Sequence, residues 1–377
     1  MDLHFPGLSD PLGFVLCLGG FLAQLWLTRR NKYLFWASVV LAVGAFSSYC
    51  ALAQYWSPSY RQWLRPKSLV WSCALTQIWC ISILSIAVAI ELRNHIPGFD
   101  ANRRLFMRTS TAAICLTPAA AVSVGILGRK NFTVNELNLK FRNLPRDLRN
   151  VRILQISDVH LGAFYSERDL EQVVDAANEL RGDLAIMTGD LITSRGDPLD
   201  ACLRQLSRLK NTSGIWACMG NHEHFADVEE AAANRGARLG VNFLRWQNRT
   251  MKFGNSSLNL VGVDYQSPHR KPYLVNAEEL VETGHFNVLL SHNPDVFPVA
   301  TEKGYDLVLA GHTHGGQVNV EIFEKNLNIA SFVTPYTRGL YQDAASAIYV
   351  NSGIGTIGMP IRLGAPPEIT LITLCDS

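Results

Sequence analysis

Charged residues are scarce in this chain of 377 residues, and no charge of one sign dominates. Asp, Glu, Lys and Arg make up 18% of the sequence, whereas an average soluble protein contains about 25%. The formal net charge is only +2, and the Lys and Arg residues form no stripe. A broad nucleic-acid-binding surface needs clustered positive charge, so we do not expect nucleic acid as a partner.

Paired cysteines are lacking as well. Five of the eight cysteines lie in the apolar first part of the chain, where a thiol behaves as a small hydrophobic group. The other three, Cys202, Cys218 and Cys375, have no paired spacing. The pattern therefore predicts neither a disulfide framework nor a CxxC metal site, and it does not indicate a cellular compartment.

Four long stretches in the first 130 residues contain no Asp, Glu, Lys or Arg. They are Pro11–Thr28, Tyr33–Tyr55, Ser68–Ile90 and Thr109–Gly128. Each is close to the roughly 20 residues that a helix needs to cross a bilayer, and Trp and Tyr lie near several ends, as at a membrane interface. Buried helices of a soluble core are the alternative, but four such stretches leave no polar face for water. We therefore predict a membrane domain, residues 1–130, with four transmembrane helices.

The first stretch could also be a signal peptide, although Met1–Asp10 has no basic residue to form its charged start. The charges between the stretches favour an N-terminus outside the cytoplasm, because Arg29–Lys32 and Glu91–Arg108 are rich in Arg and Lys. The loop Trp56–Lys67, which would lie outside, also carries basic residues and weakens this bias. Four crossings would then place the C-terminal domain outside the cytoplasm.

The rest of the chain has the pattern of an α/β domain. Residues 131–150 are polar, and we expect them to be a linker. From Val151 on, short apolar runs rich in β-branched residues alternate with segments of helical spacing. The predicted strands are Val151–Ser157, Leu184–Thr188, Ile215–Met219, Leu258–Val263, Asn287–Ser291 and Leu307–Ala310, and the predicted helices are Glu167–Leu180 and Leu199–Lys210. The alternation predicts an α/β domain over residues 151–377.

Polar motifs follow five of these strands. In chain order they are Asp158-Val159-His160, Gly189-Asp190, Gly220-Asn221-His222-Glu223, Ser291-His292-Asn293 and Gly311-His312-Thr313-His314. A lone Asp-x-His usually belongs to a surface loop, but five such motifs in succession, each after a strand, are a strong signal. Open α/β sheets bind their ligands at the carboxyl ends of strands, so we expect these side chains to meet there.

The residue types indicate a dinuclear metal site. Two divalent ions about 3.5–4 Å apart can clamp a phosphoryl group and generate a nucleophile. At an effective dielectric of 20 they repel each other by roughly 19 kcal/mol, an illustrative bound, so a shared carboxylate must offset the repulsion, and Asp190 is the candidate. The candidate ligands are Asp158, His160, Asp190, Asn221, His292, His312 and His314. Nitrogen and oxygen ligands suit Mn, Fe, Zn or Ni.

His222 remains outside this ligand set. It could act as a general acid on the leaving group or stabilise charge in the transition state, or it could merely orient a neighbour. Two roles are open for Glu223, as a partner of His222 or as an exposed surface residue. Cys218 lies within a strand and is expected in the core, and Asp183 and Asp306 precede strands, where turn or capping roles are expected.

At these motifs the chain resembles the calcineurin-like metallophosphoesterase superfamily, whose motifs run Asp-x-His, Gly-Asp, Gly-Asn-His-Asp/Glu, His and Gly-His-x-His. The resemblance covers roughly Arg152–Leu374. It implies a four-layer αββα sandwich with the metals at its rim and His222 as the catalytic imidazole. It also implies two ligand sets that share Asp190: one adds Asp158, His160 and His314, and the other adds Asn221, His292 and His312.

The sequence is most similar to a bacterial membrane-attached branch of this superfamily. The residues that carry this likeness are Ser291–Asp295, Ala310–Gln317, Arg338–Tyr341, Val350–Gly353 and Pro360–Arg362. Members of the branch are proposed to cleave cell-wall phosphoesters, or UDP-2,3-diacylglucosamine during lipid A synthesis. This chain departs from the branch at Tyr265, where a second Asp is often present, and the departure concerns the substrate rather than the metals.

The resemblance implies an integral protein of a bacterial inner or plasma membrane. We expect it to hydrolyse a phosphodiester, phosphomonoester or pyrophosphate bond by metal-activated hydroxide, in a lipid-linked, nucleotide-linked or cell-envelope substrate. Apolar loop residues could meet acyl chains or simply pack: Phe164, Tyr165, Phe323, Phe332 and Tyr336. The alternative is an inactive receptor or scaffold, which should have lost ligands. Transport through the helices is disfavoured, because the apolar stretches lack intramembrane charges.

Overall fold

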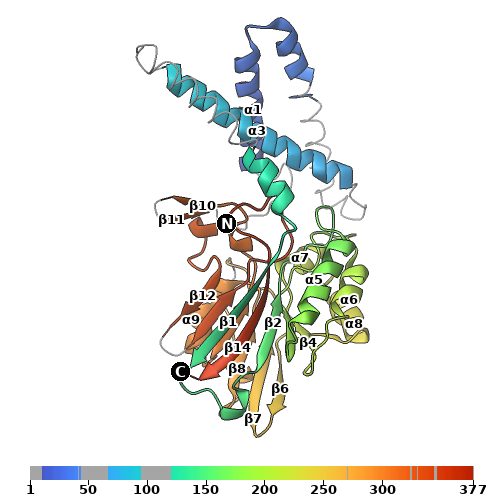
Figure 1. Ribbon diagram of the computed structural model, residues 1–377, viewed down its shortest axis with the longest axis vertical. Coiled ribbons are helices and arrows are strands. Elements are labelled where there is room, and N and C mark those ends of the chain that lie inside the picture. Colours follow the sequence, from blue (N-terminus) through green and yellow to red (C-terminus); the bar gives the residue numbers. More distant parts are fainter. Residues whose placement is uncertain are drawn as a thin grey trace. The chain divides into compact units, whose positions relative to one another are not determined.

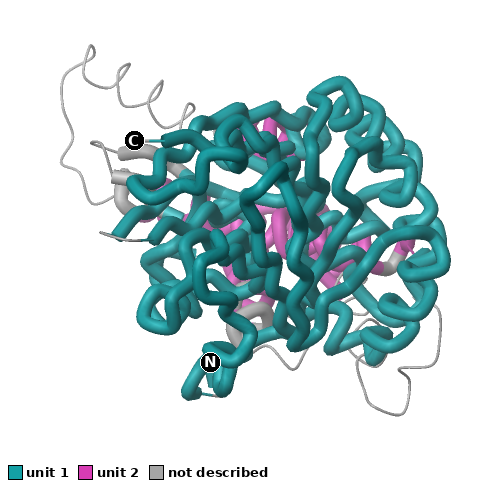
Figure 2. Tube along the Cα trace, turned by 90° about the horizontal axis from the view of Figure 1, so that it is seen from below, with its two compact units in different colours: residues 1–2, 128–357, 361–377 teal, residues 3–127, 358–360 magenta. Residues whose placement is uncertain are grey.

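The chain forms two compact units, which Figure 2 distinguishes by colour. One comprises Met1–Asp2, Gly128–Ile357 and Ile361–Ser377, and the other comprises Leu3–Leu127 and Gly358–Pro360. The computed structural model describes residues 11–40, 42–43, 67–94, 120–269, 271–322, 325–328, 330–343 and 346–376. We call the unit that contains Gly128–Ile357 the C-terminal unit and the unit that contains Leu3–Leu127 the N-terminal unit.

Two helices of the N-terminal unit, α1 (Pro11–Thr28) and α3 (Lys67–Asn94), pack against each other. A Cβ atom on Gly20 would lie 2.4 Å from the Cβ of Cys80, so the glycine permits this close approach. The Trp79 indole N–H donates to the Gln24 side-chain oxygen at 2.8 Å, which joins the same two helices.

Among the described residues, one helix, Val70–Glu91, is long and apolar enough to cross a membrane, and Cys17–Thr28 is a shorter apolar helix. These helices coincide with two of the four predicted apolar stretches. The other two stretches are described only in part, with helical residues at 32–40, 42–43 and 120–128, and the remainder lies outside the described residues. Four transmembrane helices therefore remain a prediction.

The C-terminal unit is built on two six-stranded mixed sheets (Figure 1). The first has the order β1 (Thr133–Phe141), β14 (Glu368–Asp376), β2 (Arg152–Ile156), β3 (Leu184–Met187), β4 (Ile215–Ala217) and β5 (Val241–Phe243). The second has the order β12 (Gly339–Gln342), β13 (Ala347–Val350), β9 (Leu307–Ala310), β8 (Phe286–Leu290), β7 (Ser256–Gly262) and β6 (Gln247–Phe253). Strands β2 to β5 are parallel to one another, as are β7, β8, β9 and β13.

Apolar side chains of the two sheets form one shared core. Ile153 and Ile186 of the first sheet and Val288 and Leu309 of the second are fully buried in it. The strands that carry them read as nearly continuous apolar runs because helices cover their outer faces as well. The two sheets therefore pack face to face as a sandwich.

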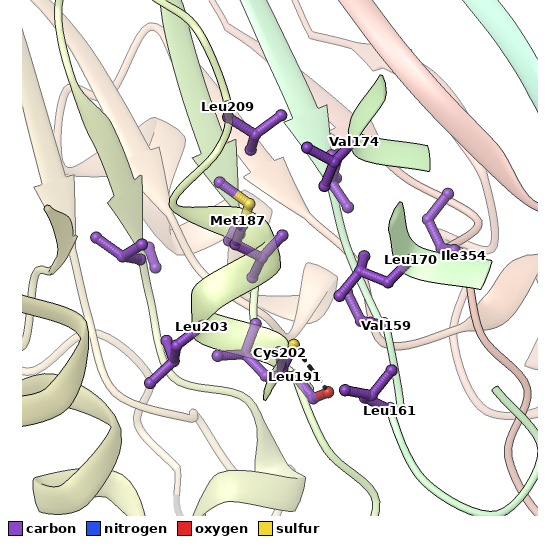
Figure 3. Close-up of a cluster of buried hydrophobic side chains, with 14 of the residues drawn as sticks. Val159, Leu161, Leu170, Val174, Met187, Leu191, Cys202, Leu203, Leu209 and Ile354 are labelled. Atoms are coloured by element: carbon purple, nitrogen blue, oxygen red, sulfur yellow. Dashed lines mark hydrogen bonds between the residues drawn. The ribbon is translucent and has the colours of Figure 1, made fainter. Parts of the chain in front are cut away.

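Helices cover the outer face of each sheet and complete four layers. On the first sheet lie α5 (Glu167–Glu179), α6 (Leu199–Leu206) and α8 (Glu229–Arg238), whose apolar faces bury Leu170, Val174 and Leu203 against Met187 (Figure 3). On the second sheet lies α9 (Phe297–Glu302), with Phe297 and Ala300 buried. The remaining described elements are α7 (Asn221–Ala226), the hairpin β10 (Asn319–Ile322) and β11 (Lys325–Asn328), and short 3₁₀ turns at Arg146–Leu148, Ala277–Leu280, Pro294–Val296, His314–Gly316 and Ala330–Phe332.

All six predicted strands and both predicted helices are present, with ends that differ by a few residues. The prediction of a linker at residues 131–150 is wrong, because Thr133–Phe141 forms β1 and pairs in parallel with β14. Leu139 and Phe141 are buried, whereas the polar residues Glu136, Asn138 and Lys140 of the same strand are exposed. This strand lies at the edge of its sheet, so it alternates in polarity instead of forming an apolar run.

Candidate metal centre

The candidate ligands lie where strands of both sheets end. Asp158 and His160 follow β2, Asp190 follows β3, and His292 follows β8. The other three ligands are Asn221, the first residue of α7, and His312 and His314, which follow β9. His222, which is outside the ligand set, comes directly after Asn221 in α7. Because β2, β3 and β4 are parallel within one sheet and β8 and β9 within the other, their carboxyl ends meet at one rim of the sandwich.

The backbone is strained at five of these residues. Asp158, His160, Asp190, His312 and His314 have φ between 47° and 77°, in the left-handed region that non-glycine residues rarely adopt. Each such backbone conformation lowers the stability of the folded protein by about 1–3 kcal/mol, so it persists only where the surrounding structure imposes it. These sharp turns let side chains two residues apart point at a common centre.

A first group contains Asp158, His160 and His314, all buried. The Nε2 atoms of His160 and His314 are 3.1 Å apart, and His314 Nε2 lies 3.4 Å from Asp158 Oδ1. His160 Nε2 is also 3.5 Å from Asp190 Oδ2. Three protein elements thus direct four ligand atoms at one point.

A second group contains Asp190, His292 and His312. His292 Nε2 lies 3.2 Å from Asp190 Oδ2, and His312 Nδ1 lies 3.2 Å from His292 Nε2. The side-chain oxygen of Asn221 is 3.0 Å from His292 Nε2 and 2.9 Å from His312 Nδ1. One oxygen, Asp190 Oδ2, is therefore within 3.5 Å of a histidine nitrogen from each group.

The spacing of these atoms fits bound divalent metal ions. Ligands about 2.1 Å from an ion are separated by about 3.0–3.4 Å when the geometry is octahedral or tetrahedral, and the contacts above span 2.9–3.5 Å. Two imidazole nitrogens facing each other need a cation or a proton between them. The donors are carboxylate, amide and imidazole, the ligands that suit first-row transition metals.

The electrostatics of the cluster support the same interpretation. Burial lowers the pKa of His160 and of His312 to about 3, so both rings are neutral, as metal ligands must be. Burial raises the pKa of Asp158 to about 6. Burial also opposes charge on His292, but the carboxylates of Asp190 and Asp158 outweigh it and raise its pKa to about 10. The buried carboxylates thus require a cation, and bound metal would take the place of this proton.

His222 lies beside both groups and is half-buried. Its Nδ1 is 2.6 Å from the Thr193 carbonyl oxygen, to which it donates, so Nε2 is left to exchange a proton. One of its ring nitrogens lies within 4.8 Å of the ligand atoms of His160 and Asp190. Its backbone N–H also donates to Asp190 Oδ1 at 2.9 Å. The residue can therefore serve a bound substrate with its ring while its backbone orients Asp190.

Glu223 is fully buried, so surface exposure, one of the two roles left open for it, is wrong. Its carboxylate accepts backbone N–H groups of Asp190 at 2.8 Å, Leu191 at 2.7 Å and Gly220 at 2.9 Å. It therefore joins the ends of β3 and β4 and fixes the turn that carries Asp190. The expectation for Cys218 is confirmed, because this residue is buried. The Asp183 and Asp306 carboxylates accept the backbone N–H groups of Arg152 and Asn287, at the starts of neighbouring strands, and these long-range bonds differ from the expected turn or capping roles.

Arg362 has a structural role that the sequence did not reveal. It is 4% exposed and donates to the carbonyl oxygens of His314, Ser352, Gly353 and Gly355, at distances from 2.5 to 3.2 Å. Its guanidinium is also 3.1 Å from His314 Nδ1, and burial lowers its pKa to about 10. The only sequence signal was its place in a motif shared with related chains.

The loop that Arg362 holds supports Asp158. The backbone N–H of Gly355 donates to the Asp158 carbonyl oxygen at 2.7 Å, and that of Ile354 donates to Ser157 at 2.9 Å. A Cβ atom on Gly353 would lie 2.5 Å from the Cβ of Asp158, so only glycine fits there. Arg362 thus links His314 and Asp158, two residues of the first group.

Two aromatic rings form a wall beside the second group. The centroid of the Tyr265 ring lies 5.8 Å from that of His312 and 6.2 Å from that of His292. The Phe225 ring lies 6.4 Å from Tyr265 and 5.8 Å from His222.

A separate cavity of about 400 Å³ is lined by none of the candidate ligands, and there Arg245 pairs with Asp264 at 2.8 Å.

Replacing Arg362 by Met should weaken divalent-metal binding by about 10- to 100-fold, the usual effect of removing support behind a ligand. It should also lower stability by about 1–3 kcal/mol, because buried carbonyl groups lose their donor. Isothermal titration with Mn²⁺ and thermal unfolding would measure the two effects. The control is Arg208→Met, which removes a 41% exposed side chain ion-paired to Asp175. Normal Mn²⁺ affinity in a destabilised Arg362→Met protein would contradict the link to the metal centre.

With this geometry established, comparison with known proteins identifies the family. Residues 151–316 match the model of the calcineurin-like phosphoesterase family. A Bacillus subtilis protein named uncharacterized metallophosphoesterase YkuE is 30% identical over 247 residues, which cover 63% of this chain and 84% of that protein. A Bos taurus transmembrane protein with metallophosphoesterase domain is 27% identical over 333 residues, which cover 81% of this chain and 73% of that protein.

Among solved structures, the sulfate thiohydrolase SoxB of Thermus thermophilus superimposes with a TM-score of 0.37 at 16% identity, covering 62% of this chain and 57% of that one. We draw no conclusion from so slight a likeness. The family model covers the strands and turns that carry all seven candidate ligands. This chain belongs to the calcineurin-like phosphoesterase family, whose members use divalent metals to hydrolyse phosphoester bonds.

Proposed function

We propose that this chain is a membrane-anchored phosphoesterase that binds two divalent transition-metal ions and hydrolyses a phosphate ester of a lipid or cell-envelope substrate. The observation that carries the proposal is the position of Asp190 Oδ2. It lies 3.5 Å from His160 Nε2 and 3.2 Å from His292 Nε2, so one carboxylate oxygen is next to a histidine of each ligand group. A bridging carboxylate is what two neighbouring dications require.

We assign the ligands accordingly. Asp158, His160, Asp190 and His314 would hold one ion, and Asp190, Asn221, His292 and His312 the other. The groups Asp158, His160, His314 and Asp190, His292, His312 support this division, and the contact between His160 and Asp190 supports Asp190 as the shared ligand. The nitrogen and oxygen donors favour Mn, Fe, Zn or Ni. When bound, such ions polarise phosphoryl oxygens and lower the pKa of water. Two divalent ions outweigh the carboxylates of Asp158 and Asp190, so the site would keep a net positive charge, which favours an anionic phosphate over a neutral ester.

The chain's own residues would supply the rest of the reaction. His222 would donate a proton from Nε2 to the departing oxygen, because its Nδ1 is held by the Thr193 carbonyl. Tyr265 and Phe225 would exclude water beside that oxygen. An inactive receptor or scaffold is disfavoured, since all seven candidate ligands and His222 are present.

Membrane anchoring has two supports. Val70–Glu91 has the length and composition of a spanning helix. The likeness to the Bos taurus transmembrane protein covers 81% of this chain, more than residues 151–377 alone can supply, so it extends into the N-terminal apolar region. We propose four spanning helices in a plasma membrane or bacterial inner membrane, with the metal centre outside the cytoplasm, because basic loops favour the cytoplasmic side. Residues 1–130 would be the membrane domain.

Asp190→Asn should abolish hydrolysis and reduce the metal content, because it removes the shared negative charge while keeping the shape of the side chain. We expect a loss of at least about 10²-fold in kcat/KM on bis(4-nitrophenyl) phosphate with added Mn²⁺. Elemental analysis of the purified protein would give the metals per chain. Asp227→Asn, at a carboxylate that is 83% exposed, is the control. Full activity, or two bound metal ions per chain, in the Asp190→Asn variant would contradict the proposal.

His222→Gln should leave metal content unchanged and lower kcat by about 10²–10⁴-fold on a substrate with an alkyl leaving group. The loss should be much smaller with a 4-nitrophenyl leaving group, since that phenolate departs without a proton. Comparing the two esters under the same conditions would test the role of the ring. An equal loss with both esters would rule out proton donation by His222.

A further inference from the structure

Two large apolar side chains of the C-terminal unit project into solvent at one turn. Phe332 is 86% exposed and Val333 is 55% exposed, at and just after the 3₁₀ turn Ala330–Phe332. We call these two residues the apolar tip. Of the aromatic loop residues singled out in the sequence, Tyr165 is 3% exposed and packs in the core, and Phe323 lies outside the described residues. Adjacent exposed apolar residues indicate a contact surface when other features point to the same partner.

The apolar tip is fixed to the metal centre on both sides. On one side, Asn328 accepts the backbone N–H of Ser331 at 2.8 Å, and a Cβ atom on Gly316 would lie 2.4 Å from the Asn328 Cβ. On the other side, the Thr334 hydroxyl donates to Asp295 Oδ1 at 2.5 Å. Gly316 is two residues from His314, and Asp295 is three from His292.

A further bond joins the segment after the tip to the ligand turn itself. The hydroxyl of Thr313, between His312 and His314, donates to the Thr337 carbonyl oxygen at 2.5 Å. Hydrogen bonds and close contacts thus connect the segments on either side of the tip to the turns that carry His292, His312 and His314. We infer that a surface in contact with the tip lies on the side of the molecule that carries these turns.

The base of the hairpin that leads to the tip lies near the point where the chain leaves its apolar region. Gly128 ends the stretch Thr109–Gly128 and belongs to the C-terminal unit. A Cβ atom on it would lie 4.0 Å from the Arg362 carbonyl oxygen. The next residue, Leu363, accepts the backbone N–H of Asn319, the first residue of β10, at 2.8 Å.

The residues that follow Gly128 are Arg129 and Lys130, and Lys130 pairs with Asp169 at 2.8 Å while its side chain stays 39% exposed. Basic residues at the end of an apolar segment are typical of the lipid headgroup region. Within the C-terminal unit, short contacts thus join Gly128, where the apolar stretch ends, to the hairpin base, the apolar tip and the ligand turn. A lipid surface is the partner that fits these features, because the tip lies on the segment connected to the end of an apolar stretch and acyl chains can accept its side chains.

We propose that the apolar tip enters the interfacial layer of the membrane in which the chain's own N-terminal helices lie, and that it holds the metal centre at the lipid–water boundary. This inference rests on the proposed function and adds a substrate class to it. The substrate is a phosphate ester whose phosphate lies among the headgroups while its acyl chains stay in the bilayer.

The experiment uses the full chain in vesicles of phosphatidylethanolamine and phosphatidylglycerol. Two substrates share a 4-nitrophenyl phosphodiester group, one carrying a diacylglycerol and the other a short water-soluble alcohol. The variants are Phe332→Asp and the matched control Val275→Asp, at a residue that is 53% exposed and away from the tip in sequence. A fluorescent amino acid placed at position 332 or 275 reports contact with brominated lipids.

We expect Phe332→Asp to lower the ratio of kcat/KM on the diacyl ester to kcat/KM on the soluble ester by about tenfold or more, and Val275→Asp to leave the ratio unchanged. Brominated lipids should quench the probe at 332 and not the probe at 275. An unchanged ratio, an unquenched probe at 332, or a tip buried against a second copy of the chain would overturn the inference. If the unmodified protein hydrolyses neither ester, the proposed function fails, whereas quenching at 332 still tests the contact separately.

Discussion

The architecture of the rim depends on one buried negative charge, that of Asp190, 2% exposed. Burial of a carboxylate is costly unless cations and hydrogen bonds surround it. Here the backbone N–H of His222 donates to one oxygen, and imidazole nitrogens of His160 and His292 flank the other. The backbone around it is equally constrained, since a Cβ atom on Gly220 would lie 2.1 Å from Asp190 Oδ1. Glu223 secures the same turn from behind through the N–H of Asp190.

Two sheets are needed to surround that charge with ligands. The first sheet alone supplies Asp158, His160, Asp190 and Asn221, and the second supplies His292 and the two histidines after β9. The shared apolar core fixes the distance between the sheets, so packing far from the rim determines the separation of the ligand atoms. The hydrogen bonds of Glu223 and Arg362 to the backbone hold the strained ligand turns in place, and without these bonds the turns would relax.

The candidate ligands could be predicted from the sequence because each belongs to a short motif directly after a strand. Strands buried on both faces are apolar runs, and each run ends in a short motif with chemically distinctive side chains. Information that depends on tertiary structure was missed. Thr133–Phe141 looked like a linker because an edge strand keeps polar residues on its open face. Arg362 lies 48 residues beyond His314, and no local pattern indicates that a loop would bring its guanidinium against the ring. Glu223 could be buried or exposed until the turn around Asp190 was known.

The central claim is that Asp190 bridges two metal ions at the rim. Anomalous X-ray diffraction at the Mn edge, on crystals of the protein grown with Mn²⁺, tests it most directly. The account predicts two anomalous peaks about 3.5–4 Å apart, both next to the Asp190 carboxylate, one among Asp158, His160 and His314 and the other among Asn221, His292 and His312. A single peak, or two peaks of which only one contacts Asp190, would contradict it.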